Sequence, residues 1–269
     1  MTKQHQLLEE LTSIQSGSIN TFFSYKAKSY KGSVLYVDQK IKEYIKQGLV
    51  RQIPFNIRPT HSRRQYLYQA TKKGCKLIGR ESEYRNKDQQ SYNAINHESM
   101  KYDVALSFVR LFPDYNIKIE YEKTFKTKEK GIRADIFIKA TKKDGTKEYD
   151  FIIETEHKDD LRQTFNDKVK PYDKAIKNGL LKNNGLSERT KVLFVCSHSH
   201  LSTFIRPQEY KEKEYLNNIS LSYKQFENLM GLVQDLDDKH FRFIPFLEFT
   251  KINQPIWRMP SGIKIKIIE

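Results

Sequence analysis

Two short segments decide the fold of the C-terminal part of the chain: ADIFIK at residues 134–139 and YDFIIETE at residues 149–156. Both are largely apolar, and KDGT at residues 143–146 lies between them. Because Asp-Gly is a strong tight-turn signal, they are predicted to form a β-hairpin with Asp144 and Gly145 in the turn. Paired residue numbers then sum to 289, which sets Asp135 opposite Glu154.

Strand alternation sorts the side chains of this hairpin onto two faces. The apolar residues expected on the core face are Ile136, Ile138, Phe151 and Ile153. Asp135, Glu154 and Glu156 share the other face, where three carboxylates repel each other unless a cation lies between them. Oxygen-only ligands at that spacing suit Mg²⁺ or Mn²⁺.

We therefore predict a metal site and a catalytic site at the same place. Asp135, Glu154 and Glu156 are the expected ligands, and Lys158 is a catalytic helper on the same face. A carboxylate-held divalent ion beside a DNA-binding module indicates phosphodiester cleavage. The alternative is that these acids form ion pairs with Arg133, His157 or Lys158 at a strand end and do no chemistry.

The positive charge of the chain is unevenly distributed. The net charge is +15 over 269 residues, yet residues 1–80 hold fifteen Lys/Arg and four Asp/Glu, so fifteen minus four gives +11 there and +4 elsewhere. A basic module joined to a nearly neutral one indicates a polyanionic partner for the basic part. Charge kept for solubility is the alternative.

Residues 1–80 show the pattern of a winged helix-turn-helix domain. Two short helices precede a longer one that begins near residue 33, with an apolar stripe at Val37, Ile41, Ile45 and Leu49. Strands at 50–53 and 65–68 flank a cationic loop at 54–64, and another helix opens at 70–74. The third helix and the loop are expected to contact DNA through Gln39, Lys40, Lys42, Lys46, Arg58, Arg63 and Arg64. A protein–protein module is the alternative.

The polar stretch at residues 81–92 is predicted to link this domain to a second one at 93–269. The second domain is expected to hold a helix at 97–112, the hairpin, a strand at 192–196, a helix around Phe226–Val233 and a strand at 241–249. The expected fold class is α+β, with the winged helix followed by an α/β domain.

Two family resemblances follow from these residues. Asp135, followed by Glu154-Thr155-Glu156 on the next strand, resembles the PD-(D/E)XK nuclease fold, with Ala134 in place of the proline and Glu156 in place of the usual lysine. The chain also resembles the replication-relaxation family of plasmid and mobile-element proteins. The matching features are residues 68–74 (YQATKKG), His97 with Asp103, residues 133–135, the Glu154 strand, Lys168 with Tyr172, and residues 255–260.

The basic first domain predicts a protein that binds double-stranded DNA, and the resemblance to the replication-relaxation family implies that it acts in replication, relaxation or mobilisation of a plasmid-like element. The alternatives are an active Mg-dependent, restriction-like endonuclease and a protein-interaction scaffold in a replication or conjugation complex, and homodimerisation stays open. No run of 18 apolar residues and no signal-peptide layout occurs, so we expect a cytoplasmic protein without a membrane partner.

Overall fold

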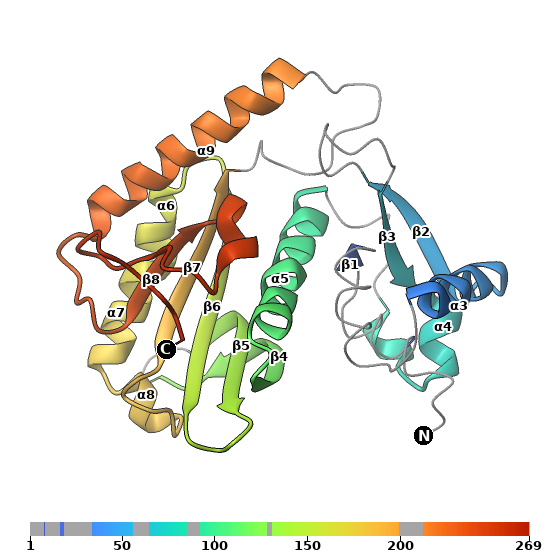
Figure 1. Cartoon of the computed structure of the whole chain (residues 1–269), viewed down its shortest axis with the longest axis horizontal. Helices are drawn as coiled ribbons and strands as arrows, with labels where there is room; N and C mark the ends of the chain where they lie inside the picture. The colour runs from blue at the N-terminus through green and yellow to red at the C-terminus, as the bar shows by residue number, and fades with distance from the viewer. Residues whose placement is uncertain are drawn as a thin grey trace. The chain divides into compact units, whose positions relative to one another are not determined.

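The computed structural model describes residues 8, 17–18, 34–55, 65–84, 92–127, 131–198 and 212–268. The chain divides into two compact units, residues 1–106 with 202–212 and residues 107–201 with 213–269. Helices and a large mixed sheet make it an α+β protein, as expected (Figure 1). The linker predicted at 81–92 stays a prediction, because residues 85–91 lie outside the described part.

The first unit holds a small antiparallel sheet in the order β1-β3-β2, with the helices α3 and α4. Their bounds are β1 Gly17–Ser18, α3 Val34–Lys46, β2 Val50–Phe55, β3 Gln65–Ala70 and α4 Lys72–Leu77, followed by the short 3-10 helix η1 Glu81–Glu83. The loop predicted at 54–64 begins too early, since Pro54 and Phe55 still pair with Tyr66 and Gln65. β2 is an edge strand, where proline is tolerated.

The junction between α3 and the hairpin depends on a close backbone approach. Gly48 has φ +70° and lies just beyond the end of α3. Thr71 caps α4 by accepting a hydrogen bond from Gly74 N at 3.1 Å. A Cβ on Gly74 would lie 2.2 Å from the carbonyl oxygen of Leu49, so this position requires glycine.

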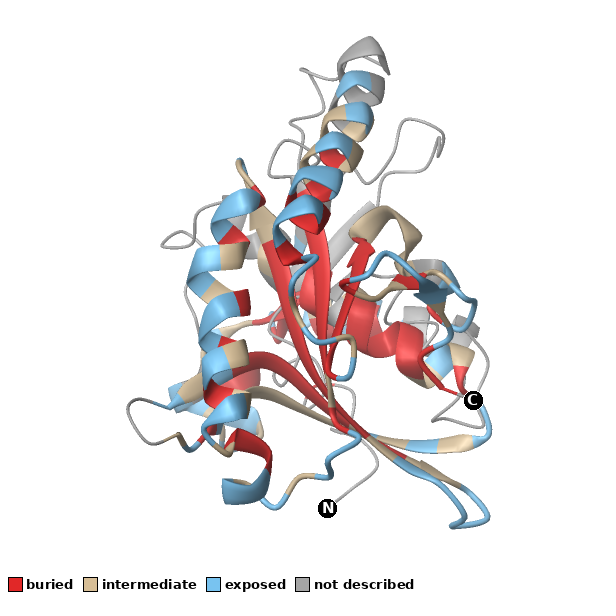
Figure 2. Ribbon diagram, turned by 90° about the vertical axis from the view of Figure 1, so that its left-hand side faces the viewer, coloured by how far each residue is buried: buried red, intermediate tan, exposed pale blue. Residues whose placement is uncertain are grey.

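The second unit is built on a seven-stranded sheet in the order β10-β9-β8-β7-β6-β5-β4. β6, β7 and β8 run parallel, and the other neighbours are antiparallel. The bounds are β4 Tyr115–Phe125, β5 Ile132–Lys142, β6 Glu148–Lys158, β7 Lys191–His198, β8 Phe241–Pro245, β9 Trp257–Arg258 and β10 Lys264–Ile265. Figure 2 shows that the central strands are buried.

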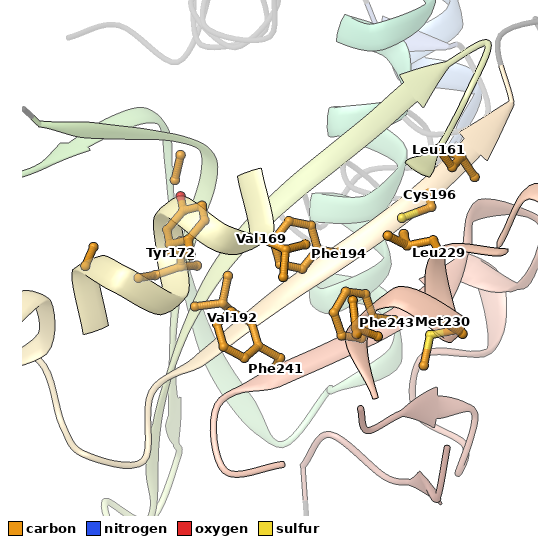
Figure 3. Packing of buried hydrophobic residues seen from close by; sticks show 14 of the residues in the cluster. Leu161, Val169, Tyr172, Val192, Phe194, Cys196, Leu229, Met230, Phe241 and Phe243 are labelled. Carbon is orange, nitrogen blue, oxygen red and sulfur yellow. The ribbon is translucent and has the colours of Figure 1, made fainter. Parts of the chain in front are cut away.

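Helices cover the sheet. They are α6 Arg162–Thr164, the π-helical segment η3 Phe165–Val169, α7 Lys170–Lys177, α8 Leu180–Asn183, α9 Glu212–Val233, the 3-10 helix η5 Phe246–Lys251 and the end of α5 Tyr92–Leu111, whose residues 92–106 belong to the first unit. One core layer joins Tyr172 of α7 and Leu229 of α9 to Phe194 of β7 (Figure 3). On the opposite face, the ring centroids of Phe108 and Phe151 lie 5.4 Å apart.

The predicted hairpin register is confirmed. All six β5–β6 pairs have residue numbers that sum to 289, from Thr141 with Glu148 to Ile136 with Ile153. The turn differs from the prediction, because Gly145 N donates to Lys142 O at 2.8 Å and Gly145 has φ +75°. Lys143 and Asp144 are therefore the central turn residues, and the register is unchanged because the loop is longer by one residue on each side.

Other boundaries of the second unit were only partly predicted. The strand at 192–196 is confirmed, and Phe226, Leu229, Met230 and Val233 are buried on α9 as expected. The strand at 241–249 is wrong beyond Pro245, where η5 begins. α5 begins at Tyr92, earlier than the predicted 97, and β4 was not predicted. None of the described helices is long and apolar enough to span a membrane.

Candidate functional site

The three predicted acids lie close together at one end of the β5–β6 ladder. Asp135, Glu154 and Glu156 are buried, with 8%, 0% and 4% of their surface exposed. The observed pairs end at Ile136 and Ile153, so the same register carried one residue further sets Asp135 beside Glu154. Glu156 shares that side of the sheet by strand alternation.

Glu154 is the most buried of the three and has both carboxylate oxygens engaged. Lys168 donates to its Oε2 at 2.7 Å, and Tyr172 donates to its Oε1 at 2.5 Å. Burial raises the pKa of Glu154 to about 8, and the charge of Asp135 adds to the rise while Lys168 and Tyr172 oppose it. The raised pKa therefore reflects first the buried position of the carboxyl group and then the nearby charge of Asp135.

Glu156 is held from the side of the following helix. Thr164 donates to its Oε2 at 3.2 Å, and the ammonium of Lys158 lies 3.2 Å from the same oxygen. Lys158 also donates to Asp167 at 2.9 Å. Burial alone would lower the pKa of Lys158, but Asp167 and Glu156 outweigh burial and raise it. Lys158 is therefore beside the acids, as predicted.

Asp135 is oriented by its neighbour across the ladder. Its Oδ2 accepts hydrogen bonds from Thr155 N at 2.8 Å and from Thr155 Oγ1 at 2.9 Å. Of the ion pairs that the alternative names, Lys158 pairs with Glu156, whereas Arg133 pairs with Glu122 at 3.1 Å. Thr155 thus fixes the carboxylate of Asp135 toward β6.

The backbone beside Asp135 adopts an unusual conformation. Among the described residues, Glu122 of β4 is the one non-glycine residue with positive φ, at 54°. The pairs Tyr121 with Ile136 and Lys123 with Ala134 bracket it, so Glu122 lies across from Asp135. A left-handed conformation at a side chain other than glycine costs of the order of 1 kcal/mol and concentrates at functional sites.

A π-helical turn brings two charged residues to the acids. In η3, Lys170 N donates to Phe165 O, a bond that spans five residues instead of four. Pro171 follows and has no N–H for the carbonyl of Asp167, so a regular α-helical bond cannot form there. Asp167 and Lys168 both lie in this segment. Asp167 forms an ion pair with Lys158, and Lys168 forms an ion pair with Glu154.

The composition of the cluster fits a hard divalent cation, although its present arrangement does not form a metal cage. The donors are carboxylate oxygens, and the nearby charge of Asp135 adds to the rise that burial causes in the pKa of Glu154. Within the described ranges, no group of three or more His, Cys, Asp or Glu side chains is arranged to hold a metal ion. Instead, the ammonium groups of Lys158 and Lys168 form ion pairs with Glu156 and Glu154.

The predicted DNA-contacting residues are only partly described. On α3, Gln39, Lys42 and Lys46 are exposed, whereas Lys40 is half-buried and pairs with Glu43 at 2.7 Å. Ile41 and Leu49 are buried, which confirms the apolar stripe at those two positions, and Tyr44 is buried beside them. The loop residues Arg58, Arg63 and Arg64 lie outside the described residues.

Residues 68–74, which carry part of the family resemblance, act structurally. Gln69 accepts from the guanidinium of Arg51, with one bond at 2.7 Å, and Thr71 donates to Gly48 O at 2.7 Å. Lys73 donates to Gln47 O at 2.9 Å, at the C-terminal end of α3. This segment therefore fixes the angle between α3 and the hairpin.

Sequence reasoning did not assign Lys168, Tyr172, Thr155, Thr164 or Asp167 to the site. Lys168 and Tyr172 were noted as part of a family pattern, and that pattern was the available signal. Their spacing of four residues sets them on one face of a helix, but nothing in the sequence shows that this face meets Glu154.

Comparison with protein-family models, with curated proteins and with solved structures finds no match for this chain. A function therefore has to be derived from the residues of the site.

Proposed function

We propose that the protein binds double-stranded DNA and that its second unit carries a Mg²⁺- or Mn²⁺-dependent site for phosphodiester cleavage. The observation that carries the proposal is the buried group of Asp135, Glu154 and Glu156 with Lys158 and Lys168 against it. Three carboxylates in a buried place are unfavourable without cations, and a hairpin with a merely structural role has no need of them.

The residues of this site would have three roles in hydrolysis: they hold the cation, orient its ligands and bind the phosphate. Asp135, Glu154 and Glu156 would hold the divalent cation, which supplies Lewis-acid activation of water and of the phosphate. Thr155 orients Asp135, and Tyr172 orients Glu154 through their hydrogen bonds. Lys158 and Lys168 are the cations that can bind the negatively charged phosphate.

The proposed winged helix of residues 1–80 would supply DNA binding. Its support is the net charge of +11, the exposed residues Gln39, Lys42 and Lys46 on α3, and the β2–β3 hairpin that follows α3. Backbone phosphates are the expected partners of the lysines, because cations on phosphates supply most non-specific affinity.

The site agrees with both resemblances at the level of residues. An acid on one strand and an acid pair on the next is the pattern that the PD-(D/E)XK resemblance implies, with Asp135 on β5 and with Glu154 and Glu156 on β6. Of the residues that carry the replication-relaxation resemblance, Lys168 and Tyr172 both contact Glu154. We infer a role in replication, relaxation or mobilisation of a plasmid-like element.

The test is incubation of supercoiled plasmid with the protein in Mg²⁺, in Mn²⁺ and in chelator. We expect nicking or linearisation in the divalent ions, none in chelator, and none with Asp135→Asn. The control Asp173→Asn removes an acid of the same charge from α7, where it pairs with the exposed Lys177. DNA binding without cleavage in any divalent ion would contradict the enzyme and leave a nuclease-like binding module.

A further inference from the structure

The ammonium groups of two lysines occupy the positions beside the carboxylates where a metal ion would bind. Lys168 Nζ lies 2.7 Å from Glu154 Oε2, and Lys158 Nζ lies 3.2 Å from Glu156 Oε2. The other oxygen of Glu154 already accepts from Tyr172. A cation that binds Glu154 therefore shares Oε2 with the ammonium of Lys168 or Oε1 with the hydroxyl of Tyr172.

The two partners of Glu154 differ in how easily they can leave. Tyr172 is fully buried, within the core layer drawn in Figure 3. The side chain of Lys168 is 34% exposed, and that of Lys158 is 25% exposed, so both ammonium groups have a route to water. A lysine side chain is long and strongly hydrated, which makes it the partner that leaves.

The charges of the cluster favour such an exchange. Asp135, Glu154, Glu156 and Asp167 carry four negative charges when ionised, against two positive charges on the lysines Lys158 and Lys168. The remaining charge of −2 is that of a site for a divalent cation. Two cations on one carboxylate oxygen repel each other strongly in a buried site, so direct ligation and the lysine contact compete.

We propose that Lys168 and Lys158 are built-in counter-ions of the metal-free site. They leave Glu154 and Glu156 when a divalent cation binds, and the released ammonium groups then bind the phosphodiester of the substrate. This inference rests on the proposed function, because it assumes that the carboxylates bind a divalent cation. It accounts for a cluster that has the donors of a metal site but not the arrangement of one.

The test is a calorimetric titration of the full-length protein with Mn²⁺, in a buffer above the pKa of about 8 of Glu154. Lys168→Met should bind Mn²⁺ about tenfold more tightly than the wild type (~1.4 kcal/mol), since a competing cation is removed. Lys158→Met should change affinity in the same direction, and it provides a second measurement if Lys168→Met does not fold. Lys177→Met is the matched control, because Lys177 lies on α7 and pairs with Asp173 at 2.7 Å.

The outcomes separate this inference from the proposed function. Tighter Mn²⁺ binding by Lys168→Met than by Lys177→Met, together with weaker binding of DNA in Mn²⁺, supports the exchange. Equal or weaker Mn²⁺ binding by both Lys168→Met and Lys158→Met overturns the exchange while leaving the metal site in place. Absence of Mn²⁺ binding in the wild type and in every variant overturns both.

Discussion

Glu154 gives the site a pH dependence that a single substitution can isolate. Its pKa rises from an ordinary value of 4.5 to about 8, chiefly because the carboxyl group is buried and then because Asp135 is near. Each pKa unit corresponds to ~1.4 kcal/mol, so the rise corresponds to a loss of at most about 5 kcal/mol in the free energy of unfolding when Glu154 is ionised. Glu154→Gln keeps the size and an oxygen acceptor for Tyr172 but cannot ionise.

The sign of the effect follows from proton binding in the two states. Between pH 4.5 and about 8 the folded protein keeps the proton on Glu154, whereas the unfolded chain has released it. Folding therefore takes up a proton in this range, and stability falls as pH rises. Below 4.5 both states are protonated, and above about 8 the full cost of the buried charge is present.

The assay is urea unfolding of the metal-free wild type and of Glu154→Gln at a series of pH values. The stability of the variant relative to the wild type should increase with pH, by up to ~1.4 kcal/mol per pH unit in the middle of the range. Asp150, whose pKa burial also raises, is present in both proteins and cancels in the difference. A difference that does not change with pH would refute the raised pKa.

Two further predictions concern the first unit. Gly74→Ala should destabilise the protein by about 2 kcal/mol in chemical unfolding, because the new Cβ would lie 2.2 Å from Leu49 O. Gly231→Ala on α9 is its control: a Cβ there would have no packing neighbour within 4 Å, so this change should stabilise the protein by up to ~1 kcal/mol. Equal effects of the two changes would contradict the close approach at Gly74. Lys42→Ala with Lys46→Ala should lower the slope of log affinity for duplex DNA against log salt by up to about 2. Lys143→Ala, in the exposed hairpin turn, is its control, and an unchanged slope in the double variant would argue against DNA contact by α3.

The hairpin shows how far the sequence alone could reach. The Asp-Gly signal between two apolar runs was enough to predict the register, because a turn centred on Asp144 and Gly145 makes paired residue numbers sum to 289. The position of Asp135 beside Glu154 follows from that register. The turn type was missed, since Asp-Gly is compatible with a longer loop that keeps the same pairs.

The partners of the acids depend on long-range packing, which no local pattern reports. Lys168 reaches Glu154 because η3 contains a π-turn before Pro171, and proline by itself predicts only a break or a kink. β4 carries an alternating signal at Ile117, Ile119 and Tyr121 that could have been found. The strained backbone of Glu122 could not, because its residue type does not require positive φ.

A melting series in Mg²⁺ and Mn²⁺ tests the central claim, a divalent cation site at Asp135, Glu154 and Glu156, without knowledge of the substrate. We predict that the melting temperature of the wild type rises with divalent concentration, as mass action requires for a ligand of the folded state. Asp135→Asn, which keeps an oxygen acceptor for Thr155, should lose this rise, and Asp173→Asn should keep it. A wild-type melting temperature that does not respond to either ion would contradict the metal site.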